Sequence, residues 1–260
     1  MNSCVHITCL LAAIPAMGCA DQTTPQARQL LMNSYSASAT GDYRAVIAGT
    51  DAFLRDSGRG GRADEAYYLR GLARYNLGDT TGAQADLSEA LDRTQSRELR
   101  GKAAIALGDL ACDRDDMPTA EAMYGKAIDN LERGVAPMDH AYYRLGCVLQ
   151  RQGRWKEADL QFALLAEFFS GSDLAARGGR RMHARDWTIQ AGTFDTQLRA
   201  EAAAKTLSDK NLPAVVVPVM ADSRLIFVVQ VGHYSTYEAA CAALAGVKAC
   251  KADAFVITAR

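Results

Sequence analysis

The residues best suited to metal or acid–base chemistry are three aspartates close together, Asp113, Asp115 and Asp116. Asp115 and Asp116 come just before Pro118, where the start of a helix favours carboxylates, so we interpret them as helix-capping residues and predict no metal site. The histidines have no zinc-ligand spacing, because they are scattered at positions 6, 140, 183 and 233. No nucleophile-elbow or phosphate-loop motif occurs. The sequence therefore predicts no catalytic site and no cofactor.

A second set of residues suits ligand binding through hydrogen bonds. The stretch WTIQAGTF at 187–194 recurs as FVVQVGHY at 227–234, so that Gln190 matches Gln230 and Gly192 matches Gly232. In each copy an apolar run with β-branched residues leads to a glycine turn, a capping position and an amphipathic helical pattern. Ser235 and Glu238 have the spacing of a capping box at the second helix.

Two further apolar runs, 214–220 and 254–258, complete the order strand, helix, strand, strand, helix, strand. This is the ferredoxin-like βαββαβ topology. Residues 187–260 resemble a SPOR domain, the bacterial module that binds peptidoglycan glycan strands, because the two stretches match its twin motifs V-Q-x-G-x-F and V-x-V-G-x-F. We place this domain at 186–260.

Strand side chains alternate between the two faces of a sheet, and this alternation predicts a binding face. If Ile189 and Val229 face the helices, the opposite face presents the predicted glycan-binding residues Thr188, Gln190, Val228 and Gln230. Amides among small apolar residues suit a sugar chain. A solvated face with glutamine as filler is the alternative.

Residues 27–171 show helical repeats with steps of 37 and 38 residues between the turns at 77–83, 114–120 and 152–158. A glycine precedes each turn, at positions 71, 108 and 146, and the pattern resembles the tetratricopeptide repeat (TPR). The unit around 40–46 is degenerate, with Ser34 at the glycine position and Val46 at the alanine position, and we interpret it as a cap. Residues 172–185 are expected to form a capping helix and linker. Its four arginines suit either a solvated helix or contact with an anionic surface.

The TPR resemblance implies a groove that binds a protein or peptide partner. Its inner positions would be Tyr68, Leu72, Tyr75, Ile105, Asp109, Tyr143 and Gln150, with Cys112 and Cys147 on adjacent helices. Stacking between repeats uses the same residue types, so both uses stay open.

The N-terminus has the pattern of an export signal. The apolar stretch 5–18 is too short to span a bilayer, and we expect a signal peptide at 1–19 followed by a short linker at 20–26. Ala16-Met-Gly-Cys19 resembles a bacterial lipobox, which implies lipidation of Cys19 and a membrane anchor. No Lys or Arg precedes the stretch, and Ala16 stands where Leu is usual, so a plain cleaved signal or a buried helix are alternatives. Ala20 fits transfer to the outer membrane.

Four cysteines lie beyond the signal, at positions 112, 147, 241 and 250. In an exported chain they permit disulfides, and Cys241 and Cys250 are a candidate pair. Buried free thiols are the alternative.

These observations predict two domains, an all-α TPR-like solenoid followed by an α+β SPOR-like domain. The net charge of −1 argues against nucleic acid as a partner. An RNA-binding domain of the same topology would need aromatic-rich motifs, which are absent here. We expect a non-catalytic protein on the periplasmic face of the cell envelope that binds peptidoglycan glycan strands and a protein partner. The alternative is an assembly adaptor for an outer-membrane or secretion complex, in which the C-terminal domain is only structural.

Overall fold

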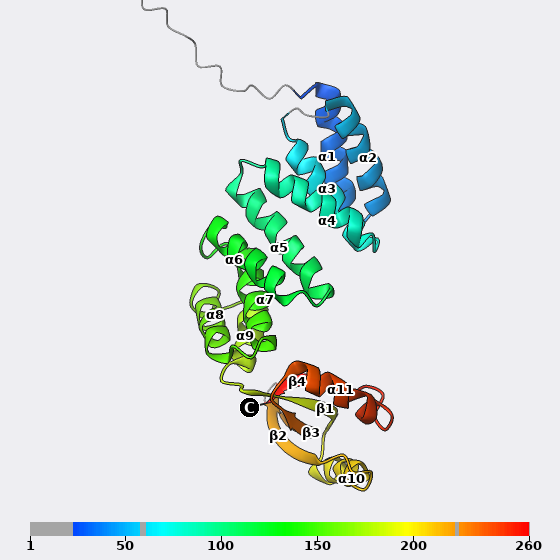
Figure 1. Cartoon of the computed structure of the whole chain (residues 1–260), viewed down its shortest axis with the longest axis vertical. Helices are drawn as coiled ribbons and strands as arrows, with labels where there is room; N and C mark the ends of the chain where they lie inside the picture. Colours follow the sequence, from blue (N-terminus) through cyan, green and yellow to red (C-terminus); the bar gives the residue numbers. More distant parts are fainter. Residues whose placement is uncertain (1–22, 58–60, 222–223, 260) are drawn as a thin grey trace, which may run out of the picture.

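The computed structural model describes residues 23–57, 61–221 and 224–259. The predicted signal peptide and Cys19 lie outside these ranges. Nine helices occupy the first part of the described chain, and a sheet with two helices follows at the far end of the long axis (Figure 1). The nine helices are α1 (Pro25–Ala39), α2 (Tyr43–Ser57), α3 (Ala63–Asn76), α4 (Thr80–Arg93), α5 (Arg97–Asp113), α6 (Met117–Asn130), α7 (Met138–Arg151), α8 (Trp155–Phe168) and α9 (Asp173–Arg181). The first helix begins inside the segment expected as a linker. Among the described helices, none combines the length and the apolar character needed to cross a membrane.

The helices pack as antiparallel pairs because a glycine on the first helix admits a large side chain from the second. A Cβ added to Gly108 would lie 2.7 Å from Cε1 of Tyr124, and one added to Gly146 would lie 2.5 Å from Cε1 of Phe162. Tyr124 and Phe162 are fully buried there. In the degenerate first pair the space is made on the second helix instead, where a Cβ on Gly49 would clash with Ser34.

The helix starts follow local capping chemistry. Asp116 caps α6, its Oδ1 accepting from the Thr119 amide at 3.2 Å, and Ser172 caps α9 by accepting from the Ala175 amide at 3.1 Å. Asp115 was also predicted as a cap, and this is wrong. It sits in the turn with a φ of 61°, which an aspartate tolerates, and pairs with Arg151 of α7.

The C-terminal part has the predicted βαββαβ order. Its elements are β1 (Asp186–Phe194), α10 (Gln197–Ser208), β2 (Ala214–Ala221), β3 (Arg224–Tyr234), α11 (Tyr237–Lys248) and β4 (Phe255–Ala259). The strands form one antiparallel sheet in the order β2-β3-β1-β4. Both helices pack on one face, over a core that includes Ile189, Val229 and Val231. The predicted capping box is wrong by one residue, because Thr236 and not Ser235 accepts from the helix, at the Ala239 amide.

Each of the two repeated motifs carries an irregularity at its glycine. The register between β1 and β3 shifts twice. One shift lies in β1 between Gln190 and Gly192, and the other lies in β3 at Gly232. Gly232 has a φ of 68°, and a Cβ there would lie 2.5 Å from the hydroxyl oxygen of Tyr234. The glycines therefore let the strands bulge and let the following aromatic ring fold back onto the core.

The cysteines are free thiols in the described part of the chain, so the predicted Cys241–Cys250 bridge is wrong. Cys241 lies in the first half of α11, and Cys250 follows the end of the same helix. At about 1.5 Å of rise per helical residue, the two Cα atoms are too far apart for a disulfide, which needs about 4.4–6.8 Å. Cys112 contacts the Tyr124 hydroxyl instead, at 3.6 Å.

The two domains meet through three aromatic rings that pack against one another. Trp155 at the start of α8 lies 5.4 Å from Trp187 of β1, ring centre to ring centre, and Trp187 lies 4.9 Å from Tyr237 of α11 in an edge-on arrangement. The guanidinium of Arg151 covers Tyr237 at 4.2 Å. Trp187 is only 3% exposed. This packing, with an aromatic anchor buried from both sides, fixes the sheet against the last helix pair.

Candidate functional site

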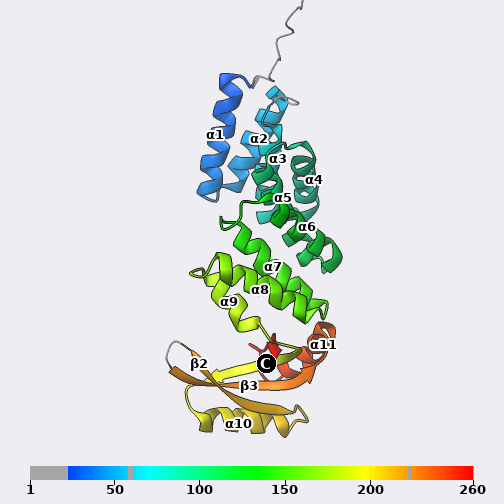
Figure 2. The same cartoon turned by 90° about the vertical axis from the view of Figure 1, so that its left-hand side faces the viewer.

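The face of the sheet opposite α10 and α11 carries a hollow of about 830 Å³. In both views the sheet lies between α9 and α10, so this hollow opens on the side of α9 (Figure 2). Its walls are mainly apolar, and its polar groups are two amides, two hydroxyls, one imidazole and one guanidinium. The lining residues are Arg180 of α9, Gln190 and Thr193 of β1, Val215, Val217, Pro218, Val219 and Met220 of β2, Ile226, Val228, Gln230 and His233 of β3, and Ile257 and Thr258 of β4.

The two predicted glutamines meet in the middle of this face. Gln190 and Gln230 are direct cross-strand partners, and both side chains are half-buried. Nε2 of Gln190 donates to Oγ1 of Thr193 at 3.0 Å, which the bulge has brought to the same face. Within the described residues this is the one hydrogen bond of the Gln190 side chain that we observe, so its second N–H and its carbonyl oxygen remain for a ligand.

Thr188 does not belong to the site, and its prediction as a glycan-binding residue is wrong. Its side chain is fully buried, and Oγ1 donates to the Gly232 carbonyl at 2.7 Å. The hydroxyl thus satisfies the main chain of the bulge in β3. Val228 does line the hollow but forms its floor, with 6% of the residue exposed.

Apolar side chains that the twin motifs do not contain make up much of the open face. Val215, Val217 and Val219 pair with Gln230, Val228 and Ile226, which puts them on this face. Val215 is 51% exposed, and Phe255, the partner of Gln190 on β4, is 50% exposed. The alternation within 214–220 could have predicted the valines. An exposed apolar surface of this kind marks a place of interaction.

The inner positions of the helical repeats are engaged with one another. Asp109 of α5 accepts from the Tyr124 hydroxyl at 2.6 Å and from Nε of Arg144 at 3.0 Å, and its other oxygen lies 3.2 Å from Nε2 of His140. Burial raises the pKa of the Asp109 carboxyl, but the hydrogen bonds from His140 and Tyr124 and the charge of Arg144 outweigh it and hold the pKa below its usual value. Asp109 thus joins three helices.

The two tyrosines of the first predicted groove helix, Tyr68 and Tyr75, are half-buried. The Tyr75 hydroxyl donates to Oδ2 of Asp113 at 2.6 Å, and this hydrogen bond, together with burial, raises the pKa of Tyr75 to about 12. Burial raises the pKa of Tyr68 to about 12. Neither tyrosine therefore ionises near neutral pH, and each remains a hydrogen-bond donor.

Three predicted groove residues are buried and cannot contact a partner. Ile105 and Tyr143 are each 8% exposed, and Gln150 is fully buried. Helix α9 is the reason at the last repeat. Arg177 lies 4.9 Å over the Tyr143 ring, and Gln150 exchanges two hydrogen bonds with Arg181. The half-buried residues Tyr68, Leu72, Tyr75 and Asp109 are what remains of the predicted groove.

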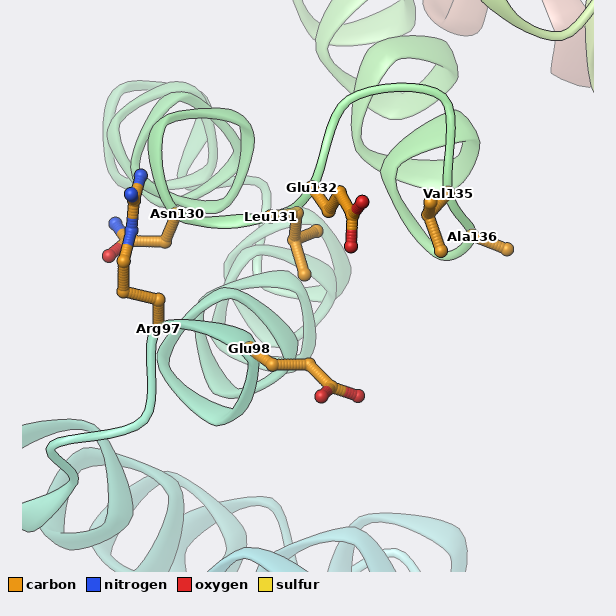
Figure 3. Close-up of a pocket in the computed structure, with 7 residues that line it drawn as sticks. All are labelled: Arg97, Glu98, Asn130, Leu131, Glu132, Val135 and Ala136. Carbon is orange, nitrogen blue, oxygen red and sulfur yellow. The ribbon is translucent and has the colours of Figure 1, made fainter.

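A separate recess of about 450 Å³ lies at the start of α5 and the loop after α6 (Figure 3). Its lining mixes both charges: Arg97, Glu98, Asn130, Leu131, Glu132, Val135 and Ala136. Arg97 donates from Nη2 to the Asp129 carbonyl at 2.8 Å, so its charge is directed at the main chain. The recess contains no residue of either predicted site.

The three clustered aspartates point to three different partners. Asp113 accepts from Tyr75, Asp115 pairs with Arg151, and Asp116 caps α6. Across the described ranges, no group of three or more His, Cys, Asp or Glu side chains is placed to hold a metal ion.

Comparisons with known proteins agree with this architecture. Residues 184–258 match the sequence model of a family described as SPOR domain. A crystal structure of a tetratricopeptide repeat protein from Parabacteroides merdae is 14% identical over 72% of this chain and 68% of that chain, with a TM-score of 0.51. A crystal structure of MamA is 20% identical over 55% of this chain and 78% of that chain, with a TM-score of 0.47. A crystal structure of the type IV pilus biogenesis factor PilW is 15% identical over 58% of this chain and 66% of that chain, with a TM-score of 0.49. A comparison with curated protein sequences found no match. The first structure shows the fold of the helical part as paired TPR-type helices, and modules of these two kinds are typically non-catalytic binding modules.

Proposed function

We propose that this chain, a TPR-type helical region followed by a SPOR domain, is a non-catalytic cell-envelope protein that binds peptidoglycan glycan strands on the open face of its sheet. A SPOR domain implies peptidoglycan binding. The observation that carries the proposal is the hollow of about 830 Å³ with Gln190 and Gln230 at its centre and valines of β2 beside them.

The chemistry of a glycan matches this lining. Sugar hydroxyls and acetamido groups need donors and acceptors, which the two amides supply, while the ring faces need apolar contact, which Val215 and Val217 supply. The lining residues come from all four strands, so the hollow extends across the sheet and can contact several sugars of a polymer. A small ligand would bury itself more fully in an enclosed pocket.

The helical region would bind a protein or peptide partner through Tyr68, Leu72, Tyr75 and Asp109, the predicted groove residues that stay half-buried. Export through residues 1–19, with a lipid on Cys19, would place the protein on the periplasmic face of the envelope, anchored in the outer membrane. These parts of the proposal rest on the sequence patterns described above.

The test is a binding isotherm of the full chain on purified sacculi treated with amidase. Gln190→Ala should weaken binding because it removes one or two hydrogen bonds, worth about 0.5–1.5 kcal/mol each. Gln230→Ala should act in the same direction but less, since among the described residues none orients its amide as Thr193 orients that of Gln190. Glu201→Ala, at an exposed position of α10, is the control.

If the three variants bind with equal affinity, the glycan does not bind on this face. No binding of the wild-type chain to any sacculus preparation would favour the second function, an assembly adaptor in which the sheet domain only packs against the repeats. The aromatic contacts of Trp187 with Trp155 and Tyr237 are the observation that favours this alternative.

A further inference from the structure

The helical domain bounds the hollow on the sheet at one end. Arg180, near the end of α9, lines the hollow together with Thr258 of β4, which pairs with Trp187 near the start of β1. Residues 182–185 are all that separates α9 from β1, so this end of the hollow lies next to the domain junction. Figure 2 shows α9 on the side of the sheet opposite α10. A glycan strand that continued across the sheet in this direction would therefore meet α9.

Side chains from both domains hold the sheet in this position. Trp155 of α8 lies 5.4 Å from Trp187, and the guanidinium of Arg151 on α7 lies 4.2 Å over the ring of Tyr237. Trp155 and Arg151 belong to the last helix pair of the repeats, whereas Trp187 and Tyr237 belong to the sheet domain. Ring stacking and cation–π contacts are individually modest, so an interface built on them is reversible.

The docked arrangement carries a cost at the same junction. Nε of Arg151 and Nε1 of Trp187 are buried, and neither has a hydrogen-bond partner among the residues that the structure describes. A buried donor that has gained no acceptor from the protein destabilises the arrangement that buries it. Separation of the two domains would expose both N–H groups to solvent. Ring packing thus favours docking, and the desolvation of two donors opposes it.

The link between the domains allows such a separation. The amide of His183 donates to Oδ1 of Asp159 on α8 at 2.9 Å, and Arg185 donates from Nη2 to the other oxygen of the same carboxylate at 2.9 Å. The link is therefore anchored on the helical domain up to Arg185. The sheet domain can turn about the backbone bonds between Arg185 and β1 while both hydrogen bonds stay in place.

We propose that the docked arrangement is autoinhibited: α9 obstructs one end of the binding face, and the sheet domain binds a glycan strand fully only after it has turned away from α9. This goes beyond the function proposed above and rests on it. Docking and glycan binding then compete, so the affinity of the whole chain is reduced by the fraction of molecules that are docked. The contacts of Trp155 and Arg151 with Trp187 and Tyr237 set that fraction.

The first test removes the helical side of the ring contact in the full chain. Trp155→Ala should bind amidase-treated sacculi about 3–10-fold more tightly than wild type, which corresponds to a docked fraction of about 70–90% in the wild-type chain. Trp155 lies on α8 and does not line the hollow, so the substitution leaves the binding face intact. Leu160→Ala, at an exposed position of the same helix, is the matched control and should keep the wild-type affinity.

The second test observes the separation itself. Trp155→Phe keeps an aromatic ring at the junction and leaves Trp187 as the single tryptophan of the chain. Trp187 is 3% exposed when the domains are docked. Saturation with soluble glycan strands released by amidase should shift its emission to longer wavelength, because the indole loses its cover. Trp155→Ala should show the longer wavelength before any glycan is added.

The outcomes separate this inference from the function on which it rests. Binding of Trp155→Ala with wild-type affinity or more weakly would refute the autoinhibition and leave glycan binding by the sheet in place. The same follows if glycan binds to Trp155→Phe without moving the emission of Trp187, and this measurement decides alone if Trp155→Ala does not fold. Absence of binding by the wild-type chain and by both variants would instead refute the function proposed for the sheet.

Discussion

The inner surface of the helical repeats and the open face of the sheet carry similar polar side chains but use them for different purposes, packing in the first and ligand binding in the second. On the repeats, the side chains of Asp109 and Gln150 form hydrogen bonds with neighbouring helices. On the sheet, Gln190 and Gln230 line a hollow on the face away from α10 and α11. A repeat is stable only when stacked on its neighbours, so its polar inner residues are recruited to the stack. A sheet with helices on one face can leave its other face for a ligand.

If the repeats serve structure, the side chains at their helix crossings must contribute to the stability of the fold. Phe162 gives the strongest test. It is fully buried and fills the space above Gly146 and beside Gly178. Phe162→Ala should lower the free energy of unfolding by about 3–5 kcal/mol, because it removes a buried ring and leaves a cavity. Urea unfolding of the full chain measures this.

Leu160→Ala on the same helix is the control, since Leu160 is 57% exposed and should change stability by no more than about 0.5 kcal/mol. If both substitutions cost the same, the register of the last repeat described here is wrong.

Asp109 tests whether the polar groups of the repeats hold the stack together. Asp109→Asn should cost about 1.5–3 kcal/mol of unfolding free energy, the scale of hydrogen bonds to a charged group, because Arg144 loses its counter-ion. Asp129→Asn, an exposed aspartate on α6, should have no measurable effect.

The Asp109 effect should depend on pH. The folded-state pKa of Asp109 lies below its ordinary value of about 3.9, so its charge stabilises the fold above that pH. The contribution is lost as the pH falls through the folded pKa. The difference between wild type and Asp109→Asn should therefore shrink below about pH 4. A difference that stays constant down to pH 2.5 would contradict the ion-pair account.

The sequence allowed the fold of both parts to be predicted, because each part repeats itself. The 40-residue offset of Gln190 and Gln230 located two strands that pair with each other, and the glycines at 71, 108 and 146 located the helix crossings. Strand alternation then placed Gln190 and Gln230 correctly. It failed at Thr188, because the bulge at Gly232 created an unpaired carbonyl that this hydroxyl satisfies.

The rest of the site depends on contacts between segments that no periodicity relates. Arg180 reaches the sheet because α9 docks on the last repeat and the tryptophans fix the junction. Gln150 became buried through the same docking. A glutamine on an inner helix position has the same local pattern whether α9 covers it or a partner does, so its role follows from tertiary packing alone.

The two glutamines give the finest test of the comparison. Nε2 of Gln150 donates to the Arg181 carbonyl at 2.9 Å, and its carbonyl oxygen accepts from Nε of Arg181 at 2.8 Å. Gln150→Ala removes both bonds from a fully buried site and should lower the free energy of unfolding by about 1–2 kcal/mol. Its affinity for amidase-treated sacculi should change by less than about twofold. Gln190→Ala should do the reverse, weakening glycan binding while leaving the urea midpoint close to that of wild type, because its amide faces solvent.

The two variants delete the same atoms, so each is the control of the other. If Gln150→Ala weakens binding to the sacculi as much as Gln190→Ala does, the repeats and the sheet do not divide structure and binding between them as proposed.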